Sequence, residues 1–126
     1  MSQRTPLGKV RGLGSAKDGT EHFWKQRLTG VANMILVCWM LVVLVKVAGA
    51  DYETVKRTLA RPQNAIAIAL FMLSVTMHMR LGMQVIIEDY VHSEGRKFLA
   101  LMANSFFTVV IALTSIYAIL KLSLGA

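Results

Sequence analysis

The stretch MHMRLGMQVIIEDYVH, at residues 77–92, places chemically active side chains inside an apolar run. His78 and Arg80 interrupt the run, and Asp89 and Tyr90 close it. An imidazole can bind a metal, a carboxylate accepts hydrogen bonds, and a phenol can donate one. Ionisable groups are costly inside a membrane and often mark functional sites. These side chains are therefore the first candidates for chemistry.

Three apolar segments must position these side chains. Residues 28–45 and 98–120 carry no charged residue, and residues 64–87 contain only two ionisable ones, a histidine and an arginine. A helix needs roughly 20 apolar residues to cross the hydrocarbon core, and its backbone groups must pair internally there. We therefore expect an all-α membrane protein with three transmembrane helices. Their expected bounds are about 28–47, 63–91 and 97–122.

The polar, basic residues 1–27 are expected to form a cytoplasmic tail, of which residues 1–20 have little structure of their own, followed by a three-helix anchor at 28–123. The end of the tail resembles an interfacial segment, because Phe23 and Trp24 suit the headgroup level. The tail glycines do not follow the spacing of a phosphate-binding loop. No cleavable signal sequence is visible, so the first span is expected to stay in the membrane.

Basic residues favour a cytoplasmic N-terminus and a periplasmic C-terminus, because positive charge collects on the cytoplasmic side. In that orientation eight lysines and arginines lie inside and five lie outside. The inside set is Arg4, Lys9, Arg11, Lys17, Lys25, Arg27, Arg96 and Lys97, and the outside set is Lys46, Lys56, Arg57, Arg61 and Lys121.

The net charge of +7 is read as a sign of topology and of anionic lipid, not of nucleic acid. Cys38 is the single cysteine, so neither an intrachain disulfide nor a cysteine-based metal site is expected. The N-terminal Met and the lack of a long targeting segment favour a multi-pass protein of a bacterial inner membrane.

Helical geometry, at about 100° per residue, places Ser74, His78, Gly82 and Asp89 on one narrow stripe of the second span. Gly82 leaves room one turn from the imidazole for a flat group such as heme, whose iron accepts a histidine ligand. A second histidine ligand would have to come from another chain. A structural histidine, hydrogen-bonded to a neighbouring helix, is an interpretation that stays open.

Asp89 and Tyr90 lie about 16–18 Å along the helix from His78, at the expected cytoplasmic interface. The phenol could donate to a carbonyl of an amphipathic ligand, and the carboxylate could orient donors or relay protons. An interfacial tyrosine beside a helix-end carboxylate is the alternative. Arg80 points away from the stripe and would face a partner helix, the interface or an anionic cofactor group.

His78, Gly82, Asp89 and Tyr90 fit the pattern H-x(3)-G-x(6)-D-Y. This pattern resembles the signature of the smaller membrane anchor subunit of succinate dehydrogenase. The three-span plan, the basic tail and QRLTG before the first span are also similar to that family. The resemblance implies packing with a second three-helix anchor subunit and one heme b shared with it.

The same resemblance implies roles for individual residues. His78 would be an axial ligand of the heme iron, and Arg27 would lie near the heme propionates and the quinone pocket. Tyr90 would hydrogen-bond a carbonyl of ubiquinone, supported by Asp89. Succinate oxidation would occur on a flavoprotein subunit, with electrons arriving through an iron-sulfur subunit, so this chain would be a non-catalytic anchor. The resemblance assigns no role to His22 or His92.

A small proton-linked transporter or channel subunit is the alternative function. His78, Arg80 and Asp89 would then form a proton path. Such a path usually spreads ionisable groups across both leaflets, and the first and third spans have none in their cores.

Overall fold

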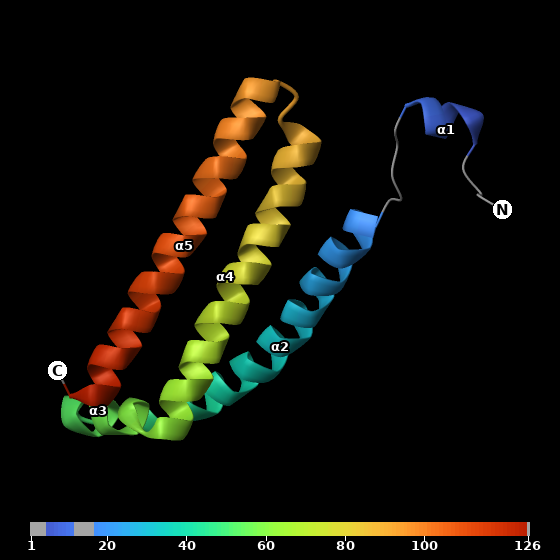
Figure 1. The fold of residues 1–126 in the computed structure, drawn as a ribbon. Coiled ribbons are helices and arrows are strands. Elements are labelled where there is room, and N and C mark those ends of the chain that lie inside the picture. Colours follow the sequence, from blue (N-terminus) through green and yellow to red (C-terminus); the bar gives the residue numbers. More distant parts are fainter. Residues whose placement is uncertain (1–4, 12–16, 126) are drawn as a thin grey trace.

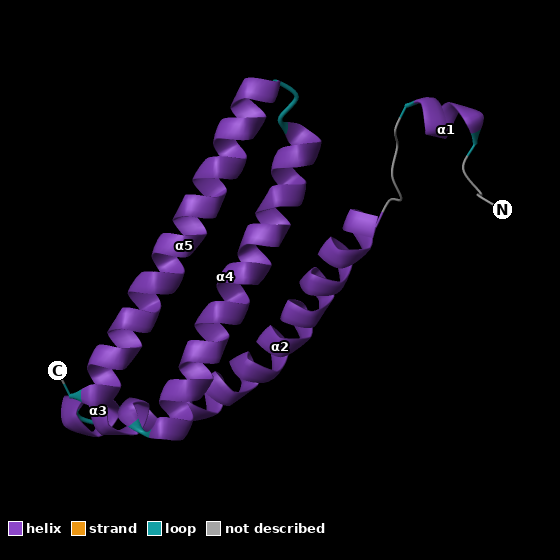
Figure 2. Cartoon of the chain, in the orientation of Figure 1, coloured by secondary structure: helices purple, strands orange, loops and turns teal. Residues whose placement is uncertain are grey.

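The computed structural model describes residues 5–11 and 17–125, and that part of the chain is helical apart from short turns. Figures 1 and 2 show five helices and no strand within these residues. The helices are α1 (Pro6–Val10), α2 (Lys17–Val47), α3 (Tyr52–Ala60), α4 (Pro62–Tyr90) and α5 (Glu94–Leu124). Arg4, Gly12 and Gly14, which entered the sequence argument, lie outside the described residues.

The long helices α2, α4 and α5 form one layer, with α4 in the middle. Helix α4 contacts α2 along one side and α5 along the other, whereas α2 and α5 make no contact in the described part of the chain. The N-terminal half of α2 diverges from the upper part of α4 (Figure 1). All three helices are long and apolar enough to cross a membrane, which confirms the three-span prediction.

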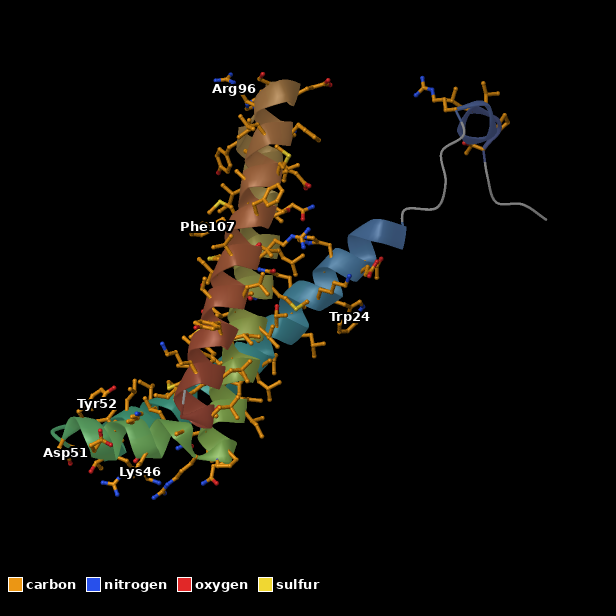
Figure 3. All side chains as sticks on the ribbon, turned by 60° about the vertical axis from the view of Figure 1, so that its left-hand side comes forward. Trp24, Lys46, Asp51, Tyr52, Arg96 and Phe107 are labelled. Atoms are coloured by element: carbon orange, nitrogen blue, oxygen red, sulfur yellow. The ribbon has the colours of Figure 1, made fainter. Side chains whose placement is uncertain are left out.

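Most large apolar side chains point outward. The buried apolar residues of the described chain are Val43, Ala65 and Ile87. Figure 3 shows side chains projecting from every exposed face of the long helices. A soluble monomer rarely exposes an apolar patch larger than a few hundred Å². This surface therefore suits lipid and partner helices, as expected of a multi-pass membrane protein.

Helix α2 begins at Lys17, well before residue 28, where the first membrane helix was expected. No proline interrupts residues 17–27, and Lys25 Nζ lies 2.6 Å from Glu21 Oε1 in an i, i+4 ion pair, an arrangement that supports helices. The expectation of little structure in residues 1–20 is therefore wrong for 17–20, and α1 adds a short helix at Pro6–Val10.

Helix α3 closes the end of the layer where the C-terminal end of α5 also lies (Figure 1). Asp51 caps α3, since its Oδ2 accepts from the Thr54 backbone N–H at 3.2 Å and its Oδ1 from the Thr54 hydroxyl at 2.6 Å. Pro62 then starts α4 at a position where a helix loses no hydrogen bond to proline. In Figure 3, Asp51, Tyr52 and Lys46 lie at this end and Arg96 lies at the opposite end.

Small polar side chains pack α4 against α5. Thr76 and Thr108 are each 4% exposed, and Asn104 Nδ2 donates to the carbonyl oxygen of Arg80 at 3.0 Å. These contacts agree with the interhelical role expected of polar residues in the third span. Gly95 lies in the first turn of α5, three residues before the apolar segment 98–120 begins.

Candidate functional site

The stripe of α4 that carries His78 faces α2. The hydroxyl of Ser74 donates to the carbonyl oxygen of Thr29 at 3.3 Å. One turn further, the His78 ring contacts Thr29 and Gln26. Another turn on, a Cβ added to Gly82 would lie 3.4 Å from Gln26 Nε2. The predicted stripe is therefore a helix–helix contact surface over this part of α4.

Two contacts of the Thr29 hydroxyl favour one tautomer of the His78 ring. The hydroxyl is placed to donate to the carbonyl oxygens of Lys25, at 2.8 Å, and Gln26, at 3.1 Å, within its own helix. Its oxygen lies 3.1 Å from His78 Nδ1, where it can accept a hydrogen bond from a protonated Nδ1. His78 Nε2 then has a lone pair, which the amide nitrogen of Gln26 approaches at 3.4 Å. Nε2 is the nitrogen that could bind a metal.

The imidazole packs directly against Gly30 of α2. A Cβ added to Gly30 would lie 3.4 Å from His78 Cε1 and 3.8 Å from Nδ1, so the missing side chain lets the ring approach the α2 backbone. One turn along α4, the missing side chain of Gly82 leaves room for the Gln26 amide, which a Cβ there would meet at 3.4 Å. A group that took the place of the Gln26 side chain would therefore meet no side chain at Gly82.

Gln26 is held weakly at this junction. Its contact with His78 is long for a hydrogen bond, and its buried Oε1 has no hydrogen-bond partner among the described residues. A buried acceptor without a donor costs free energy. A ligand that binds His78 Nε2 could therefore displace Gln26 at small cost.

Sequence reasoning missed the α2 half of this site. His22, Gln26, Thr29 and Asn33 follow each other at spacings of four, three and four residues, which places them on one side of a helix. Such a polar stripe on an otherwise apolar span was the available signal. Three of these side chains have a buried polar atom without a partner in the described part of the chain: His22 Nε2, Gln26 Oε1 and Asn33 Oδ1.

The site contains one metal-binding side chain. No group of three His, Cys, Asp or Glu side chains that could hold a bare metal ion occurs in residues 5–11 and 17–125. A single imidazole suits an iron already held by the four nitrogens of a porphyrin. The residues present therefore fit heme better than a free ion.

Arg27 does not join His78 in this chain. Its guanidinium lies 4.2 Å from the centre of the Phe23 ring, where a cation–π contact holds it on an exposed part of α2. Arg27 is about 200° around the helix from Thr29, the residue that touches the imidazole. Its predicted place near a cofactor depends on groups outside this chain.

Asp89 and Tyr90 are the last two residues of α4, beyond its contacts with α2. Both are exposed, Tyr90 to 77%, and neither side chain has a hydrogen bond or ion pair within the described residues. They lie about 16–18 Å along the helix from His78. The structure thus separates the predicted residues into an enclosed imidazole and an open phenol–carboxylate pair.

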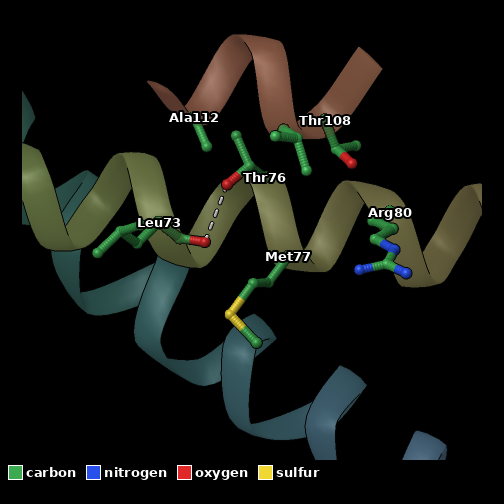
Figure 4. Close-up of a pocket in the computed structure, with 7 residues that line it drawn as sticks. Leu73, Thr76, Met77, Arg80, Thr108 and Ala112 are labelled. Carbon is green, nitrogen blue, oxygen red and sulfur yellow. Dashed lines mark hydrogen bonds between the residues drawn. The ribbon is translucent and has the colours of Figure 1, made fainter. Parts of the chain in front are cut away.

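Arg80 points away from His78, as predicted. It lines a small pocket of about 140 Å³ between α4 and α5, together with Thr76, Thr108 and apolar residues (Figure 4). It also lines a second pocket, with Lys25 and Gln84. Arg80 therefore belongs to the outer surface of the α2–α4 pair and not to the surroundings of the imidazole.

Comparison with known proteins gives one consistent family. The family model described as succinate dehydrogenase/fumarate reductase transmembrane subunit matches residues 1–112. The chain is 32% identical to the succinate dehydrogenase hydrophobic membrane anchor subunit of Paracoccus denitrificans, covering 100% of this chain and 97% of the relative. No solved structure gives a significant match.

Two further relatives carry similar names. The succinate dehydrogenase hydrophobic membrane anchor subunit of Rickettsia bellii is 28% identical, over 92% of this chain and 93% of its own length. The succinate dehydrogenase membrane anchor subunit of Reclinomonas americana is 34% identical, over 68% of this chain and 73% of its own length. The similarity to the Rickettsia bellii subunit spans nearly all of this chain, and that to the Reclinomonas americana subunit about two thirds of it.

Proposed function

The chain belongs to the family of succinate dehydrogenase/fumarate reductase transmembrane subunits, and we propose that it anchors a succinate:ubiquinone oxidoreductase, holds heme b and forms part of the ubiquinone-reducing site. Three membrane-capable helices support the anchor role. In this proposal the partners are a second three-helix anchor subunit, an iron-sulfur subunit and a flavoprotein subunit. The complex lies in a bacterial inner membrane, with the N-terminus of this chain in the cytoplasm and its C-terminus in the periplasm.

One observation carries the heme proposal: the Thr29 hydroxyl oxygen lies 3.1 Å from His78 Nδ1 and can accept its proton, while Nε2 has only the long contact with the Gln26 amide. When bound, heme supplies a one-electron redox centre. Thr29 holds the ring orientation and keeps Nδ1 protonated, as outer hydrogen-bond partners do for metal-binding histidines. Gln26 would give up its weak contact with Nε2 to such a ligand. A second histidine ligand would come from the second anchor subunit.

Helix α4 links this site to the place where ubiquinone is reduced. Reduction of the quinone consumes two electrons and two protons. The Tyr90 phenol is exposed at the end of α4, where it can donate a hydrogen bond to a quinone carbonyl. Asp89 lies beside it and can orient that donor or pass on a proton. Arg27, exposed on α2, would contribute positive charge to the heme propionates or the quinone only where the assembled complex brings them to its side of that helix.

The transporter alternative has no observation in its favour. In the described chain, the ionisable side chains at membrane depth are concentrated on α4, and His78 is hydrogen-bonded to α2 and does not line an open path. The family match covers most of the chain and concerns a transmembrane subunit of a dehydrogenase or reductase. The anchor function is therefore the better proposal.

The test is the optical spectrum of the purified complex carrying His78→Ala. We expect the reduced-minus-oxidised heme b signal to disappear or to change strongly, while all subunits still co-purify. His92→Ala is the matched control, since His92 is exposed just beyond the same helix, and it should leave the spectrum unchanged. An unchanged spectrum in His78→Ala would show that this imidazole is not an axial ligand.

A further inference from the structure

A second polar site lies at the end of the layer closed by α3, far from His78. A pocket of about 140 Å³ forms where α2, α3 and α4 meet. We call it the α3-end pocket, and its main lining residues are Trp39, Lys46, Thr58, Arg61, Gln63 and Asn64. None of these residues takes part in the proposed heme or quinone chemistry.

The walls of the α3-end pocket are well fixed. Asn64 is 6% exposed, and its Nδ2 donates to the carbonyl oxygen of Thr58 at 2.7 Å, which ties the start of α4 to α3. The carbonyl oxygen of Arg61 accepts the backbone N–H groups of Asn64 and Ala65, both at 2.9 Å. Arg61 is thus held at the junction of two helices with its side chain exposed at the pocket.

The pocket carries positive charge without a matching acid. Lys46 comes from the last turn of α2 and Arg61 from the α3–α4 junction. Neither has an ion-pair partner among the described residues, where the only ion pair is between Glu21 and Lys25. Gln63, in the first turn of α4, brings the positive end of that helix dipole to the same place. The chemistry of this lining favours an anion.

The depth of the α3-end pocket in the membrane and the residues around it indicate what kind of anion it would bind. Lys46 follows directly after the apolar segment 28–45, so the pocket lies at the level of the lipid headgroups. The ring of Trp39 and the side chains of Val42 and Val43 form its apolar side. An occupant with a charged head and an apolar tail would satisfy both parts of this lining.

The distribution of charge along the chain supports a lipid. In the proposed orientation this end faces away from the cytoplasm, where basic residues are disfavoured. Even so, five basic residues lie at this end: Lys46, Lys56, Arg57, Arg61 and Lys121. Positive residues at a membrane interface attract anionic lipid headgroups. A local anion would explain why these charges occur on the unfavourable side.

We propose that the α3-end pocket binds the phosphate of an anionic phospholipid. The Arg61 guanidinium and the Lys46 ammonium bind the phosphate oxygens. Trp39 packs against the glycerol region, and the acyl chains run along the exposed apolar surface of α2. Bound in this way, the lipid joins α2 to the α3–α4 junction.

The test uses the intact complex, purified in mild detergent and reconstituted into phosphatidylcholine nanodiscs with increasing phosphatidylglycerol. Native mass spectrometry counts the phosphatidylglycerol retained, and thermal unfolding follows its stabilising effect. We expect Arg61→Gln to weaken phosphatidylglycerol binding on the order of tenfold, as suits the loss of one charge-assisted contact. Arg57→Gln is the matched control, because Arg57 lies on α3 but outside the pocket, and it should bind like the wild type.

Arg61→Lys separates loss of charge from damage to the fold, because it keeps a cation at the same place. It should retain most of the binding, and the heme spectrum should stay unchanged in all three variants, so failure here would not touch the proposed function. Equal phosphatidylglycerol binding by Arg61→Gln and wild type would overturn the proposal. So would a carboxylate of a partner subunit found against Arg61 in the assembled complex.

Discussion

The hydroxyl oxygen of Thr29 lies 3.1 Å from Nδ1 of His78 and favours the ring tautomer in which Nε2 is free. This contact joins α2 to α4, as a structural histidine would. It also leaves Nε2 with a lone pair, as an iron ligand requires. The structural and ligand interpretations of His78 are therefore compatible, because each uses a different nitrogen of the ring.

Substituting Thr29 by valine should weaken heme binding. Valine keeps the shape of the side chain but removes the acceptor for Nδ1–H, so the ring can rotate or change tautomer. Loss of such an outer partner typically lowers the affinity for a metal centre about 10–100-fold. The measurement is the ratio of heme to protein in the purified complex, with its reduced-minus-oxidised spectrum.

Thr29→Ser is the control for that experiment, because serine retains the hydroxyl. It should keep near-wild-type heme content. If Thr29→Val also kept full heme content and an unchanged spectrum, the Thr29 contact would have no part in positioning the ligand.

A side chain at Gly30 should also displace the imidazole. A Cβ there would already lie 3.4 Å from His78 Cε1, so the longer side chain of Gly30→Leu must push the ring aside. Overpacking of this kind costs about 1–3 kcal/mol. We expect heme content to fall in Gly30→Leu, measured by absorbance of the purified complex. Gly95→Leu is the control, since a Cβ at Gly95 meets no atom within 4 Å, and heme retention by both variants would show that Gly30 has no part in positioning the imidazole.

The sequence was sufficient to predict the three spans and the alignment of Ser74, His78 and Gly82 along one side of a helix. Both follow from regular geometry: a minimum apolar length and a rotation of about 100° per residue. It was not sufficient to identify Thr29 and Gln26 as the neighbours of the imidazole. Spacing within one helix does not determine which helix lies opposite, and hydroxyl and amide groups occur in spans for packing alone.

The start of α2 was misjudged for a different reason. The change from polar to apolar residues near residue 28 marks where lipid begins, whereas a helix continues wherever nothing interrupts its backbone hydrogen bonds. The short α3, at Tyr52–Ala60, lies between two of the expected spans. There the cap at Asp51 and the proline at Pro62 are local signals that define both ends.

Replacing Tyr90 by phenylalanine should lower quinone reduction without loss of heme. The change removes one hydroxyl from an exposed ring, so assembly should be unaffected. Loss of one hydrogen bond of about 0.5–1.5 kcal/mol corresponds to a decrease of roughly 2- to 13-fold in kcat/KM for ubiquinone. Steady-state succinate:ubiquinone reductase assays measure it. Tyr52→Phe, an equally exposed tyrosine at the opposite end, should have no effect, and full activity of Tyr90→Phe would exclude the phenol as a quinone contact.

The cap of α3 should depend on pH. Hydrogen bonds from the Thr54 hydroxyl and backbone N–H lower the pKa of Asp51 below its ordinary 3.8. Because the pKa of Asp51 is lower in the folded chain than in the unfolded chain, the ionised carboxylate stabilises the fold. This stabilisation is complete above the pKa of the unfolded chain, and it is lost as the pH falls through the pKa of the folded chain. Hydrogen exchange of the Thr54 amide should therefore accelerate, relative to its intrinsic rate, below about pH 4.

Asp51→Asn provides the comparison for this pH effect, because its amide oxygen still caps the helix but does not titrate there. Its Thr54 protection should be nearly independent of pH, whereas Glu53→Gln should behave like the wild type. Loss of protection at the same pH in Asp51→Asn would assign the effect to another group.

The orientation of the chain can be tested with reporter fusions at two sites. A reporter fused after Ala126 should be non-cytoplasmic, and one inserted between Ser93 and Glu94, at the α4–α5 turn, should be cytoplasmic. Both expectations follow from the larger number of basic residues on the N-terminal and turn side. Alkaline phosphatase, active only outside the cytoplasm, and a fluorescent protein, which fluoresces only inside, give opposite signals at each site.

The two reporter sites are separated by an odd number of spans and must therefore lie on opposite sides of the membrane. Each site is thus a control for the other. Opposite signals with the C-terminal site inside would reverse the orientation and place Tyr90 on the side away from the cytoplasm. Protons for quinone reduction would then be taken from the periplasm, and the α3-end pocket would face the cytoplasmic leaflet. That leaflet is negatively charged, so lipid binding would survive the reversal, whereas docking of a cytoplasmic iron-sulfur subunit beside Tyr90 would not.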